Sequence, residues 1–103
     1  VRHHDGTDIA AKSGSPILAT AKGVVKEAAY DRYLGHYVKL DHGNGLQTVY
    51  AHMSTRLVSK GTVVQRNDEI GKVGSTGMST GPHLHYEVHK RGKAVDSAEY
   101  FTE

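Results

Sequence analysis

Short strand-like segments separated by turn residues recur along this chain and limit the folds that it can adopt. The clearest is residues 36–52, which carry Asn44-Gly45 at their middle. Asn-Gly is the strongest short hairpin signal, because both central residues of a type I′ turn need a positive φ. Strand signals return about every 8–12 residues, and no run has the 3.6-residue period of a long helix. The chain is therefore predicted to be an all-β antiparallel sandwich or barrel with little or no helix.

The hairpin also predicts which residues face the core. With Asn44-Gly45 as the turn, a regular pairing places four apolar residues on one face, namely Leu40, Val49, Val38 and Ala51. His52 then ends its strand on the opposite, polar side, together with Thr48 and Tyr50. A shift of one residue in the pairing would exchange the two faces. Further strands are predicted over residues 16–20, 23–29, 58–64, 69–73 and 83–90.

Size and composition exclude several classes of protein. The chain has 103 residues, which suits one domain. Its net charge of +2, from 13 basic and 11 acidic residues, gives no basic surface for nucleic acid. Cysteine is absent, which excludes disulfides and thiolate metal sites, and no apolar run could span a bilayer. Because the chain begins at Val1 and not at Met, we expect one domain over residues 1–103 that is a fragment of a longer protein.

Histidines are the unusual feature of the composition, and two of them are neighbours on one predicted strand. The run Ser-Thr-Gly-Pro-His-Leu-His-Tyr-Glu-Val occupies residues 79–88. Side chains alternate along a strand, so His83, His85 and Glu87 share one face and the apolar residues between them face the core. Two adjacent imidazoles can hold a metal with one ring and transfer protons with the other. The alternative is a strand that carries surface histidines.

A catalytic zinc ion typically takes three ligands from His, Asp or Glu and leaves a position for water. The helical His-Glu-x-x-His motif is absent, so strands and loops must supply the ligands here. His4 and Asp8 are four residues apart, and Gly6 between them allows the chain to bend. The full set of candidate ligands is His3, His4, Asp8, His36, His42, His52, His83, His85 and His89.

Three motifs occur in one order: His4-x-x-x-Asp8, Tyr50-Ala51-His52-Met53, and a run over residues 74–87 that includes Ser-Thr-Gly-Pro-His-Leu-His. Together they resemble the lysostaphin-type (LytM-type) zinc metallopeptidases that cut peptidoglycan. The resemblance extends from Arg2 to about Phe101. It implies a β-rich core crossed by a narrow groove, with one zinc ion on the groove floor.

The resemblance also implies a role for each matching residue. His4, Asp8 and His85 match the metal ligands, whereas His52 and His83 match two histidines that flank the reactive water without binding metal. Zinc can lower the pKa of bound water to about 7. A neighbouring imidazole can then accept the proton and return it to the leaving amine. Which of the two histidines is the base stays open.

Residues near these positions have open roles. His3 could replace His4 as a ligand, although the spacing to Asp8 favours His4. Glu87 could hydrogen-bond a ligand imidazole and so orient it, or it could be a surface carboxylate. The other histidines are predicted to be groove-lining, structural or exposed, namely His36, His42 and His89.

The function that the resemblance implies is a zinc-dependent endopeptidase that hydrolyses peptide cross-links of bacterial peptidoglycan. The strings Tyr-Ala-His-Met and His-Leu-His-Tyr-Glu look more like Gram-negative cross-link endopeptidases than glycyl-glycine cutters, which favours the D-alanyl–diaminopimelate bond. D,D-carboxypeptidase trimming of stem peptides is a related alternative. A second class, an inactive peptidoglycan-binding or activator module, is disfavoured because all five matched residues are present.

Location and partners follow from the same resemblance. We expect an exported protein of the periplasm or cell envelope that binds peptidoglycan stem peptides and cross-links, with no nucleic-acid partner. An inhibitory segment or regulator from the parent protein is a further expected partner. Family domains have a strand before the first ligand, and only three residues precede His4, so that N-terminal strand is expected to be missing.

Overall fold

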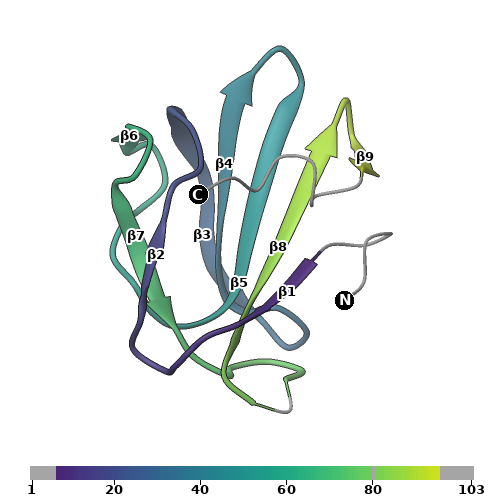
Figure 1. Cartoon of the computed structure of the whole chain (residues 1–103). Helices are drawn as coiled ribbons and strands as arrows, with labels where there is room; N and C mark the ends of the chain where they lie inside the picture. The colour runs from purple at the N-terminus through teal and green to yellow at the C-terminus, as the bar shows by residue number, and fades with distance from the viewer. Residues whose placement is uncertain (1–6, 80, 96–103) are drawn as a thin grey trace.

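A computed structural model of the chain describes residues 7–79 and 81–95 (Figure 1). Over these residues the chain forms nine strands and no helix, hence no helix that could cross a membrane. The strands are β1 (Thr7–Ala10), β2 (Pro16–Leu18), β3 (Gly23–Asp31), β4 (Gly35–Gly43), β5 (Leu46–Arg56), β6 (Val63–Val64), β7 (Glu69–Val73), β8 (His83–Lys90) and β9 (Lys93–Val95). The predicted all-β class is confirmed.

All strand pairs are antiparallel. The main path through the sheet runs β1-β8-β5-β4-β3-β6. β7 pairs with both β5 and β2, and β9 pairs with β8. Figure 1 shows β3, β4, β5 and β8 side by side as a broad sheet, with β2 and β7 adjacent to each other next to it. The site described below lies where β1, β5 and β8 meet.

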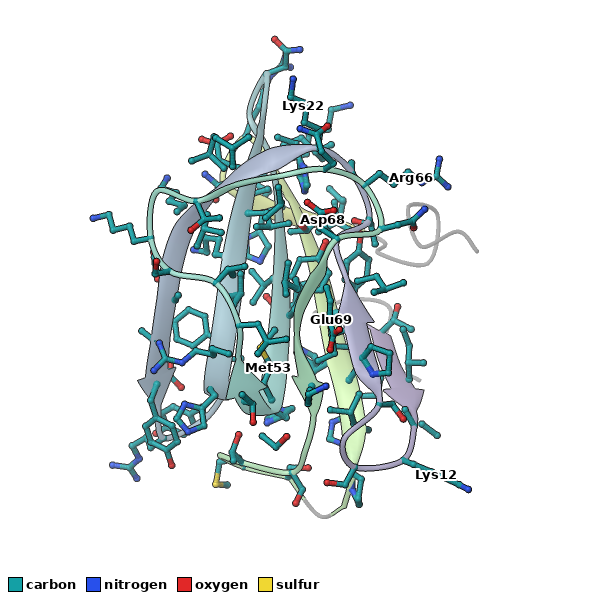
Figure 2. The ribbon with its side chains drawn as sticks, turned by 90° about the vertical axis from the view of Figure 1, so that its left-hand side faces the viewer. Lys12, Lys22, Met53, Arg66, Asp68 and Glu69 are labelled. Carbon is teal, nitrogen blue, oxygen red and sulfur yellow. The ribbon has the colours of Figure 1, made fainter. Side chains whose placement is uncertain are left out.

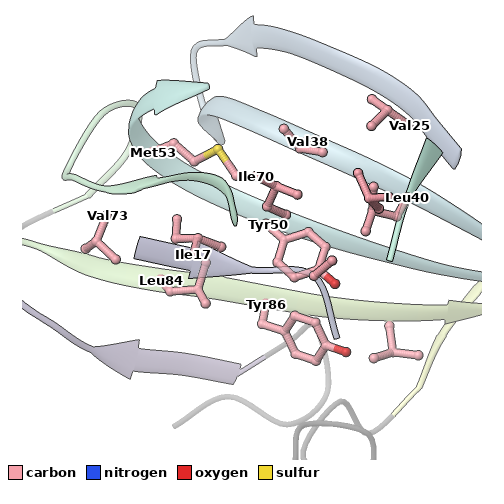
Figure 3. Close-up of a cluster of buried hydrophobic side chains, with 13 residues drawn as sticks. Ile17, Val25, Val38, Leu40, Tyr50, Met53, Ile70, Val73, Leu84 and Tyr86 are labelled. Atoms are coloured by element: carbon pink, nitrogen blue, oxygen red, sulfur yellow. The ribbon is translucent and has the colours of Figure 1, made fainter. Parts of the chain in front are cut away.

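The core fills the space between the broad sheet and the β2–β7 pair. Ile17 from β2 and Ile70 from β7 join one cluster with Leu40, Tyr50 and Tyr86 from the broad sheet (Figure 3). Fully burying a large apolar side chain stabilises a fold by about 1.5–3 kcal/mol. Charged side chains keep to the outside, and Figure 2 shows Lys12 and Arg66 pointing away from the ribbon.

The turn of the predicted hairpin is confirmed, but its register differs from the prediction. Asn44 and Gly45 have φ angles of 54° and 79°, as a type I′ turn requires. Beside the turn, a β-bulge between Asp41 and Gly43 adds one residue to β4. The pairs from Asp41–Gln47 to Val38–Tyr50 are therefore shifted by one residue from the prediction.

Because of this shift, the residues of β5 before His52 that were predicted to face the polar side face the core, and those predicted to face the core lie on the other side. Val38 pairs with Tyr50 and not with Ala51, and Tyr50 points into the core, where it is fully buried. Val49 and Ala51 are also buried, but they lie on the opposite face of the sheet, outside the core cluster, so the prediction that they join the core face was wrong. Burying the Tyr50 ring removes a large apolar surface from water, provided that the hydroxyl has a partner. Thr20 supplies that partner, with its Oγ1 2.8 Å from the Tyr50 hydroxyl.

β8 alternates as predicted. Leu84, Tyr86 and Val88 are buried in the core, and the residues between them point to the other side of the sheet. That other side carries His83, His85 and Glu87, and it forms the floor of the candidate site.

Candidate active site

Four of the residues predicted for the site meet where β1, β5 and β8 lie side by side. β1 pairs with β8, which places Asp8 directly opposite His85. On the other side of β8, Ala51 of β5 pairs with His85, so the next residue, His52, also lies close. The ring centroid of His52 is 4.9 Å from that of His83 and 5.8 Å from that of His85.

These four side chains line one cleft of about 310 Å³. Its walls come from two loops. Tyr33 and Leu34 lie on the β3–β4 loop, and Met78 and Ser79 lie on the β7–β8 loop. The backbone N–H of Met78 donates to the carbonyl of Tyr33 at 2.9 Å, so the two walls are joined to each other.

A second β-bulge brings His52 to the cleft. Between Tyr50 and Met53, β5 has one residue more than the strand opposite. His52 has a φ of 62°, which is uncommon for a residue other than glycine. Its backbone N–H leaves the ladder and donates to the carbonyl of Leu34 at 2.7 Å. Without this bulge the alternation along β5 would point His52 into the core.

Backbone carbonyls select the protonated nitrogen of two histidines in the cleft. Nδ1 of His52 is 2.7 Å from the carbonyl oxygen of Thr76, and Nδ1 of His83 is 2.9 Å from that of Gly81. A carbonyl only accepts hydrogen bonds, so each Nδ1 carries the hydrogen. In the neutral ring Nε2 then keeps its lone pair, which is the form that a general base needs.

The pKa of His52 lies below its ordinary value. Burial is the main cause, and the charges of His83 and His85 act in the same direction, while the hydrogen bond to Thr76 opposes them. His52 is therefore neutral near pH 7 and can accept a proton.

His85 lies between two carboxylates. Its Nδ1 is 2.6 Å from Oδ1 of Asp8, and its Nε2 is 2.7 Å from Oε2 of Glu87. A neutral imidazole has a single N–H and cannot donate to both. One ring nitrogen carries the N–H of the neutral imidazole. The other nitrogen faces its carboxylate with a lone pair, so a further proton or a metal ion is needed between them. Without metal, the hydrogen bond to Glu87 raises the pKa of His85, burial opposes the rise, and Asp8 adds to it.

Glu87 connects two histidines of β8. Its Oε1 accepts a hydrogen bond from Nε2 of His89 at 2.7 Å, in addition to the bond from His85. Burial alone would raise the pKa of Glu87, but the two histidine bonds lower it below its ordinary value. The side chain of His89 is 25% exposed, so this histidine is half-buried at the surface and hydrogen-bonded to Glu87.

Asp8 is the most exposed member of the group, with 41% of its side chain accessible. Burial alone would raise the pKa of Asp8, yet the hydrogen bond to His85 and the charges of the neighbouring histidines bring it below its ordinary value. Nε2 of His83 lies 3.6 Å from Oδ1 of Asp8. In the described part of the chain, the cleft thus places the ionised carboxylate of Asp8 beside the imidazoles of His83 and His85.

The sequence model of a family described as "Peptidase family M23" matches residues 2–97. This chain belongs to peptidase family M23. It is 45% identical over 97 residues to the peptidoglycan DD-endopeptidase ShyA of Vibrio cholerae, a match that covers 94% of the chain and 23% of ShyA. The lysostaphin-type resemblance drawn from the motifs is confirmed. The chain spans about a fifth of the length of the curated relatives that it matches.

Two solved structures of peptidases have the same fold as this chain. A zinc-containing peptidase from Vibrio cholerae matches with a TM-score of 0.89 and 38% identity, over 97% of this chain and 30% of that one. The catalytic domain of lysostaphin from Staphylococcus simulans matches with a TM-score of 0.87 and 32% identity, over 94% of this chain and 77% of that one.

The donors in the cleft of this M23 domain fit zinc. Zinc takes imidazole nitrogen and carboxylate oxygen as ligands, and Nδ1 of His85 and Oδ1 of Asp8 face each other. A zinc-binding histidine usually donates its other N–H to a carboxylate, the position that Glu87 has at Nε2. Within residues 7–79 and 81–95, no group of three or more such side chains is arranged to hold a metal ion. The predicted third ligand, His4, and its alternative, His3, lie outside the described residues.

Two residues of the M23 cleft had no role in the sequence predictions. The carbonyl of Thr76 holds His52, and Oγ of Ser79 lies 3.2 Å from Nδ1 of His83. Both belong to the Gly-, Ser- and Thr-rich loop between β7 and β8, whose composition by itself indicates only a flexible connection. Its position directly before two candidate histidines was the available signal, because loops held by a rigid scaffold often carry functional groups.

Proposed function

We propose that this domain is a zinc-dependent endopeptidase that hydrolyses the peptide cross-links of bacterial peptidoglycan. The observation that carries the proposal is the cleft itself. Two imidazoles with free Nε2 lone pairs, His52 and His83, lie beside the donor pair of Asp8 and His85. Membership of family M23 and the peptidoglycan activity that the name of ShyA states support the substrate class.

The proposed metal ligands are Asp8 and His85, together with His4. Zinc, when bound there, acidifies a water molecule and polarises the peptide carbonyl. Glu87 keeps the proton of His85 on Nε2, so that Nδ1 is available as the ligand atom.

His52 and His83 carry out the proton transfers in this proposal. One of the two Nε2 lone pairs accepts the proton of the attacking water and later gives it to the leaving amine. The other ring, once protonated, donates a hydrogen bond to the oxyanion that develops on the carbonyl. The carbonyls of Thr76 and Gly81 hold both rings in the required tautomer.

We further propose that the bond cleaved is the D-alanyl–diaminopimelate cross-link. The motif strings around His52 and His83 support it, as does the identity to an enzyme named as a DD-endopeptidase. Peptidoglycan lies in the cell envelope, so this substrate implies that the protein acts there, in the periplasm of a Gram-negative cell.

The experiment that tests the proposal pairs zinc analysis with digestion of purified sacculi of the diaminopimelate type. We expect about one zinc ion per chain and the loss of cross-linked muropeptide dimers, with both abolished by a chelator and restored by added zinc. Removal of only the terminal D-alanine from pentapeptides would instead support the carboxypeptidase. A folded chain that binds no zinc would refute the enzyme proposal and favour the binding module.

Variants separate the roles of the histidines. His85→Ala should lose zinc and activity together, whereas His83→Ala and His52→Ala should keep zinc and lose most of the turnover. His42→Gln is the matched control, because His42 bonds to the carbonyl of Lys22 and to Thr48, away from the cleft. Loss of zinc in His83→Ala with retention in His85→Ala would reverse the assignment.

A further inference from the structure

We propose that Thr76 is a positioning residue for His52, and that its side-chain hydroxyl is what fixes the tautomer of that histidine. The consequence for turnover rests on the proposed function, whereas the consequence for the imidazole does not. Thr76 lies on the β7–β8 loop and touches the ring through its backbone, with its carbonyl oxygen 2.7 Å from Nδ1 of His52.

The hydroxyl of Thr76 attaches this loop to the two central strands of the sheet. Its Oγ1 donates to the carbonyl of Met53 on β5 at 2.6 Å. The same oxygen accepts the backbone N–H of His36 on β4 at 3.1 Å. A hydroxyl has one hydrogen and two lone pairs, so both bonds form together.

These two bonds occur at the second β-bulge. Met53 and His36 are paired across β5 and β4, and Met53 directly follows His52. The hydroxyl therefore bonds to the strand one residue from the histidine, while the carbonyl of the same threonine bonds to the ring. The two bonds hold the Cα and Cβ of Thr76 in place beside β5, so a displacement of the residue that carried its carbonyl away from His52 would have to break them.

Close backbone packing leaves the loop little freedom to shift as a whole. Gly35 and Gly77 both have positive φ angles, 66° and 73°. A Cβ on Gly35 would clash with Thr76, and a Cβ on Gly77 would approach the carbonyl of Tyr33 to 2.7 Å. The Thr76 carbonyl is thus kept beside His52 by the hydroxyl bonds that hold its residue in place and by close-packed backbone at Gly35 and Gly77.

Fixing the tautomer matters because the two forms of a neutral imidazole do opposite things. With the hydrogen on Nδ1, His52 presents a lone pair at Nε2. If the carbonyl of Thr76 turned away, the ring could carry its hydrogen on Nε2 instead and would lose the ability to accept a proton there.

The test compares Thr76→Val, which keeps the branched shape and removes the hydroxyl, with Thr76→Ser, which keeps the hydroxyl. Imidazole ¹⁵N NMR, with His52 assigned by His52→Asn, reports the tautomer whether or not the protein cleaves peptidoglycan. We expect the Nδ1–H form in the wild type and in Thr76→Ser, and a mixture in Thr76→Val. Thr62→Val, on the loop before β6, is the matched control and should resemble the wild type.

For the zinc-loaded protein acting on cross-linked muropeptides, we expect Thr76→Val to lower kcat about 10- to 100-fold and to leave KM within about threefold. A positioned general acid or base accelerates a reaction roughly 10²- to 10⁴-fold, and the expected fall in kcat is part of that acceleration. Thr76→Ser should stay within about threefold of the wild type in both constants. A fall in kcat together with the tautomer change supports the proposal.

Two results would overturn it. One is an Nε2–H tautomer of His52 in the wild type, a measurement that needs no Thr76 variant and holds even if Thr76→Val folds poorly. The other is a Thr76→Val protein with the wild-type tautomer, whatever its activity. If the wild type does not cleave peptidoglycan at all, the proposed function fails, and the NMR comparison still decides the role of Thr76.

Discussion

Replacement of Glu87 by glutamine tests how the candidate metal centre is built. Its two carboxylate oxygens accept hydrogen bonds from His85 and His89, each at 2.7 Å, and only 18% of the side chain is exposed. Glutamine keeps the size of the side chain, removes its charge and leaves one oxygen to accept hydrogen bonds. The amide nitrogen then faces one of the two histidines as a donor, so that histidine can no longer donate a hydrogen bond to residue 87.

We expect Glu87→Gln to weaken zinc binding about 10- to 100-fold, the usual effect of removing the carboxylate behind a zinc-binding histidine. That range corresponds to about 1.4–2.8 kcal/mol. It agrees with the roughly 1.5–3 kcal/mol that a hydrogen bond to a charged group contributes, and Glu87 makes one such bond to His85. The full value applies because the carboxylate is largely shielded from solvent.

The affinity is measured by competition with a chromophoric chelator at fixed pH. Glu69→Gln is the matched control, because Glu69 is an exposed glutamate on β7 paired with Lys72 at 3.0 Å, and it should change affinity less than about twofold. His89→Asn removes the other partner of Glu87 and should have a smaller effect than Glu87→Gln. Zinc affinity in Glu87→Gln within twofold of the wild type would refute the orienting role.

The same variant has a predicted pH dependence. Metal binding at Nδ1 displaces the proton that His85 shares with Asp8, so zinc affinity should rise as the pH increases through the raised pKa of His85. Glu87 is the largest cause of that raised pKa. In Glu87→Gln the rise in affinity should therefore shift to lower pH, and an unshifted profile would show that another group controls it.

Three further predictions concern the scaffold. Tyr50→Phe removes the acceptor of the Thr20 N–H and should lower the free energy of unfolding in urea by about 1–3 kcal/mol; a loss below about 0.5 kcal/mol would contradict it. The hydrogen bond from Tyr37 is the main cause of the lowered pKa of Glu27, so Tyr37→Phe should move that pKa toward 4.5 in an NMR titration. The stability that Glu27 contributes is present above pH 4.5 and is lost as the pH falls through its lowered pKa; the variant should lose part of this dependence, because Lys39 and Lys26 still lower the pKa of Glu27. Gly35→Ala puts a Cβ against the β7–β8 loop at a φ of 66°, so both Tm and turnover should fall; an unchanged Tm would contradict it.

The parts of the fold that sequence could predict are those set by local chemistry. Asn44-Gly45 determines its own turn, and the alternation over β8 separates His83 and His85 from the buried Leu84. The register of β5 could not be predicted in this way, because each bulge depends on contacts between strands that spacing does not encode.

In the candidate site, too, the features set by local sequence could be predicted and those set by long-range contacts could not. The pairing of His83 with His85 follows from strand period alone. The contact between Asp8 and His85 joins residues 77 positions apart, and only the family resemblance pointed to it. The contribution of Thr76 lies in a carbonyl and a loop conformation, and nothing in the type of a residue reveals where its backbone oxygen points.

The two bulges of the β4–β5 hairpin connect the core to the cleft. The first places Tyr50 in the core, and with regular alternation afterwards His52 would follow it there while Met53 faced the cleft. The second bulge reverses both, so Met53 is fully buried and His52 lines the cleft at a φ of 62°. A positive φ at a residue other than glycine costs about 1–3 kcal/mol, and burial of Tyr50 and Met53 offsets a cost of that size. The strained backbone of His52 is therefore maintained by the packing on the other face of the same strand.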